Sequence, residues 1–318
     1  AAFENDMKAK GMKLSAADIY SVNNTSIKDA IFQFGGGCTA ELVSDKGLLL
    51  TNHHCGYGSI AAASTVENNY LRDGFYAKSL KDEIRTGLTV QFLVSITDVT
   101  KEVNDSLGTL LGKARADKQT AVLASINQRL SNAEQSIECR ISPLFKGNQF
   151  LAFIYQRYRD ILLVGTPQES VGKFGGDTDN WEWPRHTGDF SVFRVYTGKD
   201  GKPAEFGPEN IPLKPKYFLP VSIRGLKDGD FAMTWGYPGS TNRYETSLGV
   251  KLSTDINNPT LVKLRDERLK YMFAEMQKDA GTKLKLASNY ASVANYWKFF
   301  DGESKQLLKF KFSLRIVW

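Results

Sequence analysis

The chain has 318 residues and a mass of 35.5 kDa, and its 42% apolar and 12% aromatic residues are enough to bury one or two cores, which excludes a mainly disordered protein. Its net charge of +6 comes from 41 basic and 35 acidic residues spread along the chain without a polybasic block, a pattern that argues against nucleic-acid binding. The longest apolar run, residues 150–155, falls far short of the roughly 18 residues that a membrane-spanning helix needs, so we expect no membrane insertion.

The chain contains only three cysteines, Cys38, Cys55 and Cys139, which excludes a disulfide-dense scaffold and leaves room for one bridge. No two cysteines have the CxxC spacing, and the three histidines do not form the helical HExxH pattern. The sequence therefore gives little support for a zinc site.

Short apolar runs broken by glycine fill residues 26–100 and predict β-structure with tight turns. Over residues 101–138 the glycines thin out and aliphatic residues recur at helical spacings, which predicts a helical stretch broken near Gly112. Strand-like runs return over residues 139–250, with turns such as residues 237–240 between them.

The composition changes near residue 252 from strand-like to helical. Asn257 and Asn258 place a cap candidate before Pro259 at a first helical position, and a second helix is predicted from about Lys283 to Phe300. We therefore predict a mainly β chain with an α-helical domain, an α+β fold. The predicted boundary separates residues 1–252, with a helical insertion near 101–138, from residues 253–318.

Two histidines, His53 and His54, follow an apolar strand and precede Cys55. A bridge between Cys55 and Cys38, which lies in a glycine-rich turn, could fix the segment that carries them. A histidine taken by itself is more often a structural residue than a base. A rigid strand end, however, is a suitable place for a general base that must face a nucleophile.

The second unusual segment, residues 175–191, combines two tryptophans, four acidic residues, Arg185 and His186. One interpretation is a polar surface loop pinned by its aromatic side chains. The other is a functional site, because loops with several ionisable groups often carry one. Asp189 lies where this loop enters an alternating apolar run, a good place for a buried carboxylate that orients an imidazole.

Three segments together resemble the bacterial dipeptidyl-peptidases 7 and 11: residues 34–39 (FGGGCT), residues 50–58 (LTNHHCGYG) and residues 177–190 (DTDNWEWPRHTGDF). The resemblance extends from about residue 13 to about residue 308. It implies a serine exopeptidase with a chymotrypsin-like double β-barrel and an added helical domain. It also implies secretion to the periplasm, a homodimer, and no metal or organic cofactor.

The resemblance assigns roles to individual residues. His54, directly before Cys55, resembles the family's general base, Asp189 resembles the triad carboxylate, and His53 would be structural. Cys38 and Cys55 resemble the bridge beside the base.

The resemblance also implies a site for the amino terminus of the substrate. Asn180 and Trp181 look like the pair that holds the free amino group of an oligopeptide, and Asn295 looks like a further contact from the helical domain. An amide oxygen can accept from the ammonium, and an indole face can attract it.

No Gly-Xaa-Ser-Gly sequence, the setting expected for the nucleophile, occurs in the chain. The resemblance places the nucleophilic serine and the oxyanion hole in a second barrel that follows the helical domain. We therefore expect the parent protein to release dipeptides by acyl-enzyme chemistry and this chain alone to be inactive. Two alternatives stay open: an incomplete fragment that at most binds peptides, and a chymotrypsin-like endopeptidase.

Overall fold

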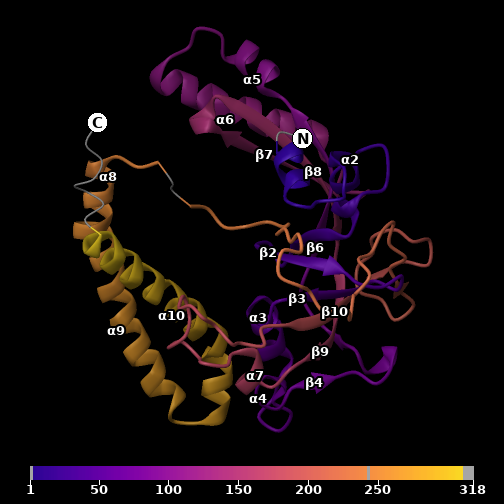
Figure 1. Cartoon of the computed structure of the whole chain (residues 1–318), viewed down its shortest axis with the longest axis vertical. Helices are drawn as coiled ribbons and strands as arrows, with labels where there is room; N and C mark the ends of the chain where they lie inside the picture. Colours follow the sequence, from indigo (N-terminus) through magenta and orange to yellow (C-terminus); the bar gives the residue numbers. More distant parts are fainter. Residues whose placement is uncertain (1–2, 242–243, 311–318) are drawn as a thin grey trace. The chain divides into compact units, whose positions relative to one another are not determined.

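The computed structural model describes residues 3–241 and 244–310, which divide into two compact units (Figure 1). Unit 1 comprises residues 1–51, 85–163 and 192–238, and unit 2 comprises residues 52–84, 164–191 and 239–318. Because three segments of the chain form each unit, neither unit can be read off the sequence as one continuous stretch.

Most of the strands belong to unit 1. The strands are β1 Ile31–Phe34, β2 Cys38–Leu42, β3 Leu48–Thr51, β4 Phe75–Tyr76, β5 Ile84–Arg85, β6 Val90–Asp98, β7 Ile137–Leu144, β8 Gln149–Tyr158, β9 Asp160–Thr166, β10 Ser191–Thr197 and β11 Ile211–Pro212. Their order in the sheet is β4-β9-β10-β3-β2-β1-β6-β8-β7, with β11 paired to β10 and β5 to β9. Every pairing whose register is described is antiparallel, as in Phe34↔Cys38 of the β1–β2 hairpin.

The predicted α+β class, an antiparallel sheet with helices, is confirmed. Among the described strands the sheet is open, since the order ends at β4 on one side and at β7 on the other. Glycines allow the tight turn of the β1–β2 hairpin, where Gly35 and Gly36 have φ values of 57° and 84°.

The helices are α1 Glu4–Ala9, α2 Ala16–Ile19, α3 His53–Ala63, α4 Tyr70–Asp73, α5 Thr100–Leu107, α6 Gly112–Leu130, α7 Glu169–Gly172, α8 Ser247–Leu252, α9 Asn258–Met276 and α10 Ala280–Lys309. Three short 3₁₀ turns cover Ile27–Asp29, Leu80–Asp82 and Phe145–Gly147. None of the helices in the described part of the chain combines the length and the apolar character that crossing a bilayer requires.

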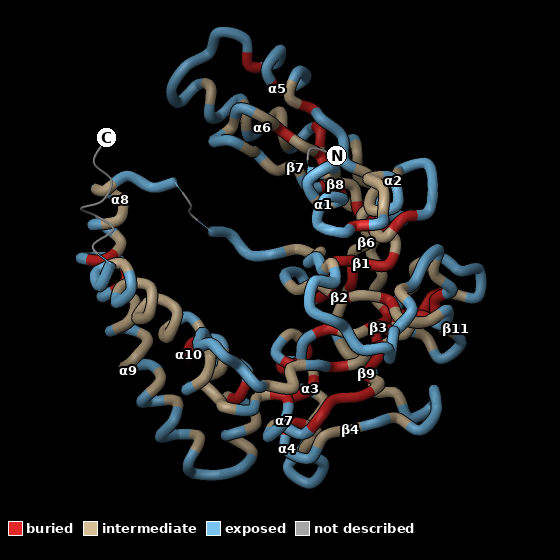
Figure 2. Tube along the Cα trace, in the orientation of Figure 1, coloured by how far each residue is buried: buried red, intermediate tan, exposed pale blue. Residues whose placement is uncertain are grey.

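The core of unit 1 forms around the strands, where buried residues are concentrated in Figure 2. All four residues of β1 are buried, and Phe34 lies against Phe193 of β10 with ring centroids 5.0 Å apart. A second apolar cluster joins α5 and α6 to β7 and β8 through residues such as Leu107, Ile126 and Phe150. The helical stretch predicted near 101–138 is thus two helices separated at residues 108–111, and β7 takes over at residue 137.

Unit 2 contains α3 and the long helices α9 and α10, which pack against each other. The helical run begins ten residues before the predicted cap, because the Thr246 side chain caps α8 by accepting from the Gly249 amide. A π-helical turn, Ser253–Asn257, then leads into α9, which accommodates Pro259 in its first turn, where no N–H is needed. The second predicted helix is longer than expected, since Asp279 caps α10 at residue 280 and the helix continues to Lys309.

Candidate functional site

The two histidines are the first two residues of α3, which follows β3 after a single residue, Asn52. Asn52 has an extended backbone (φ −69°, ψ 150°) and is the residue at which the chain turns from strand to helix. Leu49 and Thr51 of the strand are buried. The structure thus places both histidines at the start of a helix, one residue after the end of the strand that precedes them.

His54 and Asp189 form the central contact of the site. The imidazole Nδ1 of His54 lies 2.7 Å from Oδ2 of Asp189, and Oδ1 of Asp189 accepts the backbone amide of His54 at 3.0 Å. The His54 side chain is 67% exposed, whereas the Asp189 side chain is only 17% exposed. Because an ionised carboxylate can only accept, Nδ1 carries the proton and Nε2 is left as the acceptor nitrogen.

The carboxylate of Asp189 is held in its charged form. Burial alone would raise the pKa of Asp189, but hydrogen bonds from the ring and the backbone of His54, together with the smaller attraction of the two imidazoles when they are protonated, bring the pKa below its ordinary value. The carboxylate also lies at the amino-terminal end of α3, where the helix dipole favours negative charge.

His53, unlike His54, is buried. Its side chain is among the fully buried ones, with 1% of the residue exposed, and its ring meets the ring of Tyr57 edge-on at 5.6 Å. Burial lowers the pKa of His53, so the ring is neutral at physiological pH. The ring also lies against the backbone of Gly172, where a methyl group would come within 2.6 Å of it.

Cys38 and Cys55 are disulfide-bonded, and Cys139 is a free, buried thiol whose pKa is raised by burial. The disulfide occupies Cys55, and Asp189 already accepts from His54 and Asn52, so these neighbours of His54 do not offer a free ligand set for a metal ion.

The loop that precedes Asp189 is attached to α10. The Asn180 side chain donates from Nδ2 to Oδ1 of Asn295 at 2.9 Å, and the Trp181 indole donates to the Asn295 carbonyl at 3.0 Å. The Trp181 ring also lies 5.0 Å from the ring of Phe299. Lys298 donates to the carbonyl of Thr178. These contacts bring the three residues expected at the amino-terminus site, Asn180, Trp181 and Asn295, into direct contact.

Trp181 has a positive φ of 62°, a conformation that a bulky residue adopts only where its surroundings hold it. Strain of this kind is more common at functional sites than elsewhere.

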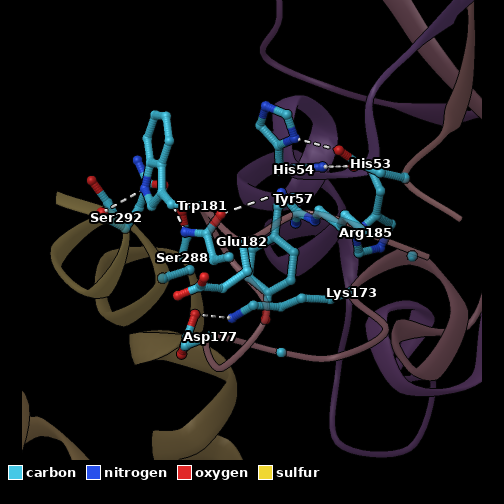
Figure 3. Close-up of a pocket in the computed structure, with 16 residues that line it drawn as sticks. His53, His54, Tyr57, Lys173, Asp177, Trp181, Glu182, Arg185, Ser288 and Ser292 are labelled. Carbon is cyan, nitrogen blue, oxygen red and sulfur yellow. Dashed lines mark hydrogen bonds and ion pairs between the residues drawn. The ribbon is translucent and has the colours of Figure 1, made fainter. Parts of the chain in front are cut away.

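A cavity of about 560 Å³ joins the two parts of the site, and Figure 3 shows the side chains that line it. His54 lies at one end of the cavity, and Lys173, Asp177 and Ser288 lie toward the opposite end in this view. Trp181 and Asn295 line it together with Asn180. A ligand in this cavity can therefore touch the imidazole and the Asn180–Asn295 pair at the same time.

Several residues of this cavity were not singled out by the sequence. Lys173 and Asp177 form an ion pair of 3.1 Å, and the Tyr57 hydroxyl donates to Glu169 at 2.7 Å. Burial, with the nearby Glu169 carboxylate, raises the pKa of Tyr57 above its ordinary value. Tyr57 and Asp177 lie within the quoted motifs without an assigned role, and the only signal for Lys173 is its i,i+4 spacing to Asp177, which is common on exposed helices.

Arg185 was noticed in the sequence but given no role. Its Nη1 donates to Oδ1 of Asn180 at 3.3 Å, and its Nε donates to Oγ1 of Thr187 at 3.1 Å. A cation thus already contacts the amide oxygen that was expected to accept the substrate ammonium.

Comparison with known proteins also points to peptidases. A protein-family model described as Peptidase S46 matches residues 1–315. The chain is 48% identical over 307 residues to an Asp/Glu-specific dipeptidyl-peptidase of Capnocytophaga gingivalis, which covers 96% of this chain and 43% of the relative. It is 49% identical over 304 residues to dipeptidyl-peptidase 7 of the same organism, and the match covers 94% of this chain and 42% of that relative.

Solved structures are similar as well. The crystal structure of Porphyromonas endodontalis DPP11 in complex with the dipeptide Arg-Asp superposes with a TM-score of 0.91 at 39% identity, covering 98% of this chain and 46% of that one. The same protein in an alternate conformation gives a TM-score of 0.70 at 40% identity, and the match covers 90% of this chain and 43% of that one. These matches confirm the resemblance to dipeptidyl-peptidases 7 and 11. The chain spans less than half the length of the relatives it matches.

Proposed function

The chain belongs to the Peptidase S46 family, and on that basis we propose that it is the amino-terminal part of a serine-type dipeptidyl-peptidase. In this proposal the parent protein releases dipeptides from the free amino terminus of peptides by acyl-enzyme chemistry. The observation that carries it is the cavity that holds the His54–Asp189 pair together with Asn180 and Asn295. The pair is suited to proton transfer, and the two amides are suited to a terminal ammonium.

In the proposed mechanism His54 is the general base. Asp189 accepts the Nδ1 proton, so Nε2 can take the proton of a serine hydroxyl while that oxygen attacks the peptide carbonyl. The imidazolium then returns the proton to the leaving amine, and the Asp189 carboxylate stabilises the cation meanwhile. In this proposal the serine and the oxyanion hole lie in the part of the relatives' length that this chain does not span, as the resemblance implies.

The amide pair would select the free amino terminus. A carbonyl oxygen has two lone pairs, so Oδ1 of Asn295 can accept from an ammonium while it accepts from Asn180. Trp181, fixed by its bond to the Asn295 carbonyl, would form a wall of the same pocket. In this proposal the distance from the two amides to His54 sets the length of the released piece.

The proposal also includes a chymotrypsin-like barrel within residues 1–252, a helical domain from residue 253, a periplasmic location and a homodimer. The boundary rests on the change in composition near residue 252, and the barrel, the location and the homodimer rest on the resemblance. The disulfide of Cys38 and Cys55 supports an oxidising compartment. Relatives named Asp/Glu-specific dipeptidyl-peptidase and dipeptidyl-peptidase 7 match at similar identity.

The test uses the complete parent protein and one peptide in two forms, with its amino terminus free and acetylated. Wild type should cleave the free form far better, and His54→Ala should lose on the order of 10⁴-fold or more of the turnover. His186→Ala, which removes the exposed histidine of the loop before Asp189, serves as the control and should keep its activity. A greater loss of turnover in well-folded His53→Ala than in His54→Ala would overturn the choice of base.

Asn180→Ala tests the amine site separately. It removes the donor that orients Oδ1 of Asn295 and an amide oxygen with a second lone pair for the ammonium. One hydrogen bond to a charged group is worth about 1.5–3 kcal/mol, or roughly ten- to hundredfold in kcat/KM for the free peptide. Reaction with a fluorophosphonate should be much less affected, since the His54–Asp189 pair remains. An unchanged ratio of free to acetylated cleavage would remove Asn180 from the amine site.

The rival function, a peptide-binding module, is tested with the 318-residue chain by itself. It should bind peptides with a free amino terminus in calorimetry and release no dipeptides. Dipeptide release by homogeneous chain would show that a nucleophile within these residues was missed.

A further inference from the structure

Asn52 occupies the N-cap position of α3, but its side chain does not cap the helix. An N-cap asparagine ordinarily accepts from the second or third amide of its own helix. Here the amide of His54, the second residue of α3, donates instead to Oδ1 of Asp189 at 3.0 Å. The capping role has passed to the carboxylate, which leaves the Asn52 side chain available for another contact.

That contact is Asp189 itself. Nδ2 of Asn52 donates to the Asp189 backbone carbonyl at 3.2 Å and to the carboxylate oxygen Oδ2 at 3.3 Å. Oδ2 is the same atom that accepts from Nδ1 of His54. Asn52 therefore donates to both the backbone carbonyl and the carboxylate oxygen Oδ2 of Asp189, which lies 137 positions later in the chain.

The position of Asn52 is fixed from its other side. Its carbonyl accepts from the hydroxyl of Ser191 at 2.9 Å, and Ser191 is fully buried at the start of β10. The same carbonyl accepts the amides of Cys55 and Gly56 in the first turn of α3. The residue is thus tied both to the strand that follows Asp189 and to the helix that carries His54.

We propose that Asn52 is a positioning residue of the catalytic pair, whose amide fixes the Asp189 carboxylate so that Oδ2 faces Nδ1 of His54. The effect on catalysis rests on the proposed function, whereas the effect on the imidazole does not. With Oδ2 held, the carboxylate cannot rotate about its χ angles, and the ring keeps the tautomer with the proton on Nδ1. Without Asn52 the carboxylate still accepts the His54 amide but gains rotational freedom, so Oδ2 faces Nδ1 only part of the time.

Two variants separate positioning from helix capping. Asn52→Leu removes the amide at similar volume. Asn52→Ser keeps a residue that caps helices well, but its side chain is too short to reach Asp189. Asn69→Leu is the matched control, because Asn69 caps α4 in the usual way by accepting the Arg72 amide at 3.0 Å and does not contact Asp189.

The first measurement is the tautomer of His54 in the 318-residue chain, read from the ¹⁵N shifts of its ring at a pH where the ring is neutral. The chain has only three histidines, so the ring signals can be assigned with His53→Gln and His186→Gln. Wild type and Asn69→Leu should show the Nδ1–H form alone, and both Asn52 variants should show a mixture. A pure Nδ1–H form in both Asn52 variants would overturn the proposal whether or not the parent protein is a peptidase.

The second measurement is steady-state cleavage by the complete protein. Both Asn52 variants should lower kcat by about three- to tenfold with little change in KM, because the bond is partly exposed and the Asn180–Asn295 pair is untouched. If Asn52→Ser had wild-type kcat while Asn52→Leu lost activity in step with its folded fraction, the residue would be only a helix cap. If the tautomer shifted but no variant of the complete protein, wild type included, cleaved peptides, the proposed function would fail and the positioning role would stand.

Discussion

Replacing Asp189 by asparagine keeps the shape of the side chain but changes what it offers to its neighbours. Three N–H groups point at the carboxylate: the backbone amide and Nδ1 of His54, and Nδ2 of Asn52. An amide has one acceptor oxygen and one donor nitrogen. If the oxygen accepts the His54 amide, the new NH₂ group faces Nδ1 and Asn52, so the ring must carry its proton on Nε2 instead.

The consequence for catalysis follows from the tautomer. A ring protonated on Nε2 has no lone pair there to accept a serine proton, so kcat of the complete protein should fall by about 10⁴-fold with the geometry almost unchanged. Turnover within tenfold of wild type would refute the reasoning, because it would mean that Asp189 does not set the tautomer.

The consequence for stability depends on pH. Loss of a charge at the start of α3 and of one hydrogen bond to a charged group should lower the free energy of unfolding by roughly 1–2 kcal/mol at pH 7. Because the pKa of Asp189 in the folded chain is below its ordinary value, the stabilisation from its charge is fully present above the unfolded pKa of about 3.9 and is lost as the pH falls through the folded value. The difference between wild type and Asp189→Asn in urea unfolding should therefore shrink below about pH 4.

Asp279→Asn provides the matched control for this pH dependence. Asp279 caps α10 by accepting the Thr282 amide at 2.8 Å, and its pKa is also lowered by that hydrogen bond. Its replacement should show a similar pH trend in stability and leave the His54 tautomer unchanged. A tautomer change in Asp279→Asn would mean that the ring responds to global stability and not to Asp189.

Two further predictions concern the contacts that hold the start of α3, where the two histidines lie. Gly172→Ala places a methyl group 2.6 Å from the buried His53 ring and should cost about 1–3 kcal/mol in urea unfolding, whereas Gly87→Ala, which meets nothing within 4 Å, should cost far less. Equal losses in the two variants would contradict the close contact. Peptide mapping without reduction should recover Cys38 linked to Cys55, and Cys38→Ser should lower the free energy of unfolding by about 3 kcal/mol. Wild-type stability of the serine variant would mean that the bridge does not contribute to folding.

The local elements of this chain follow from the sequence for a simple physical reason: strand and helix periodicity depend on neighbouring residues. The β-rich amino-terminal part, the helices of residues 101–138 and the helices after residue 252 were predicted in this way and are present. The ends of the helices were predicted less accurately. Caps such as Thr246 and Asp279 fix them through single hydrogen bonds, which the spacing of apolar residues does not reveal. The functional residues were proposed from motifs and a family resemblance, and not from periodicity.

Only the tertiary structure brings together residues that the chain keeps far apart. His54 and Asp189 are separated by 135 positions and Asn180 and Asn295 by 115, so their contacts depend on how the loop, α3 and α10 pack. The direction of a polar side chain is likewise absent from a one-dimensional pattern. In the sequence Asn52 lies in a stretch predicted as β-structure. Only its hydrogen bonds show that it reaches Asp189, because the first-turn amide that an N-cap asparagine would accept is already taken by that carboxylate.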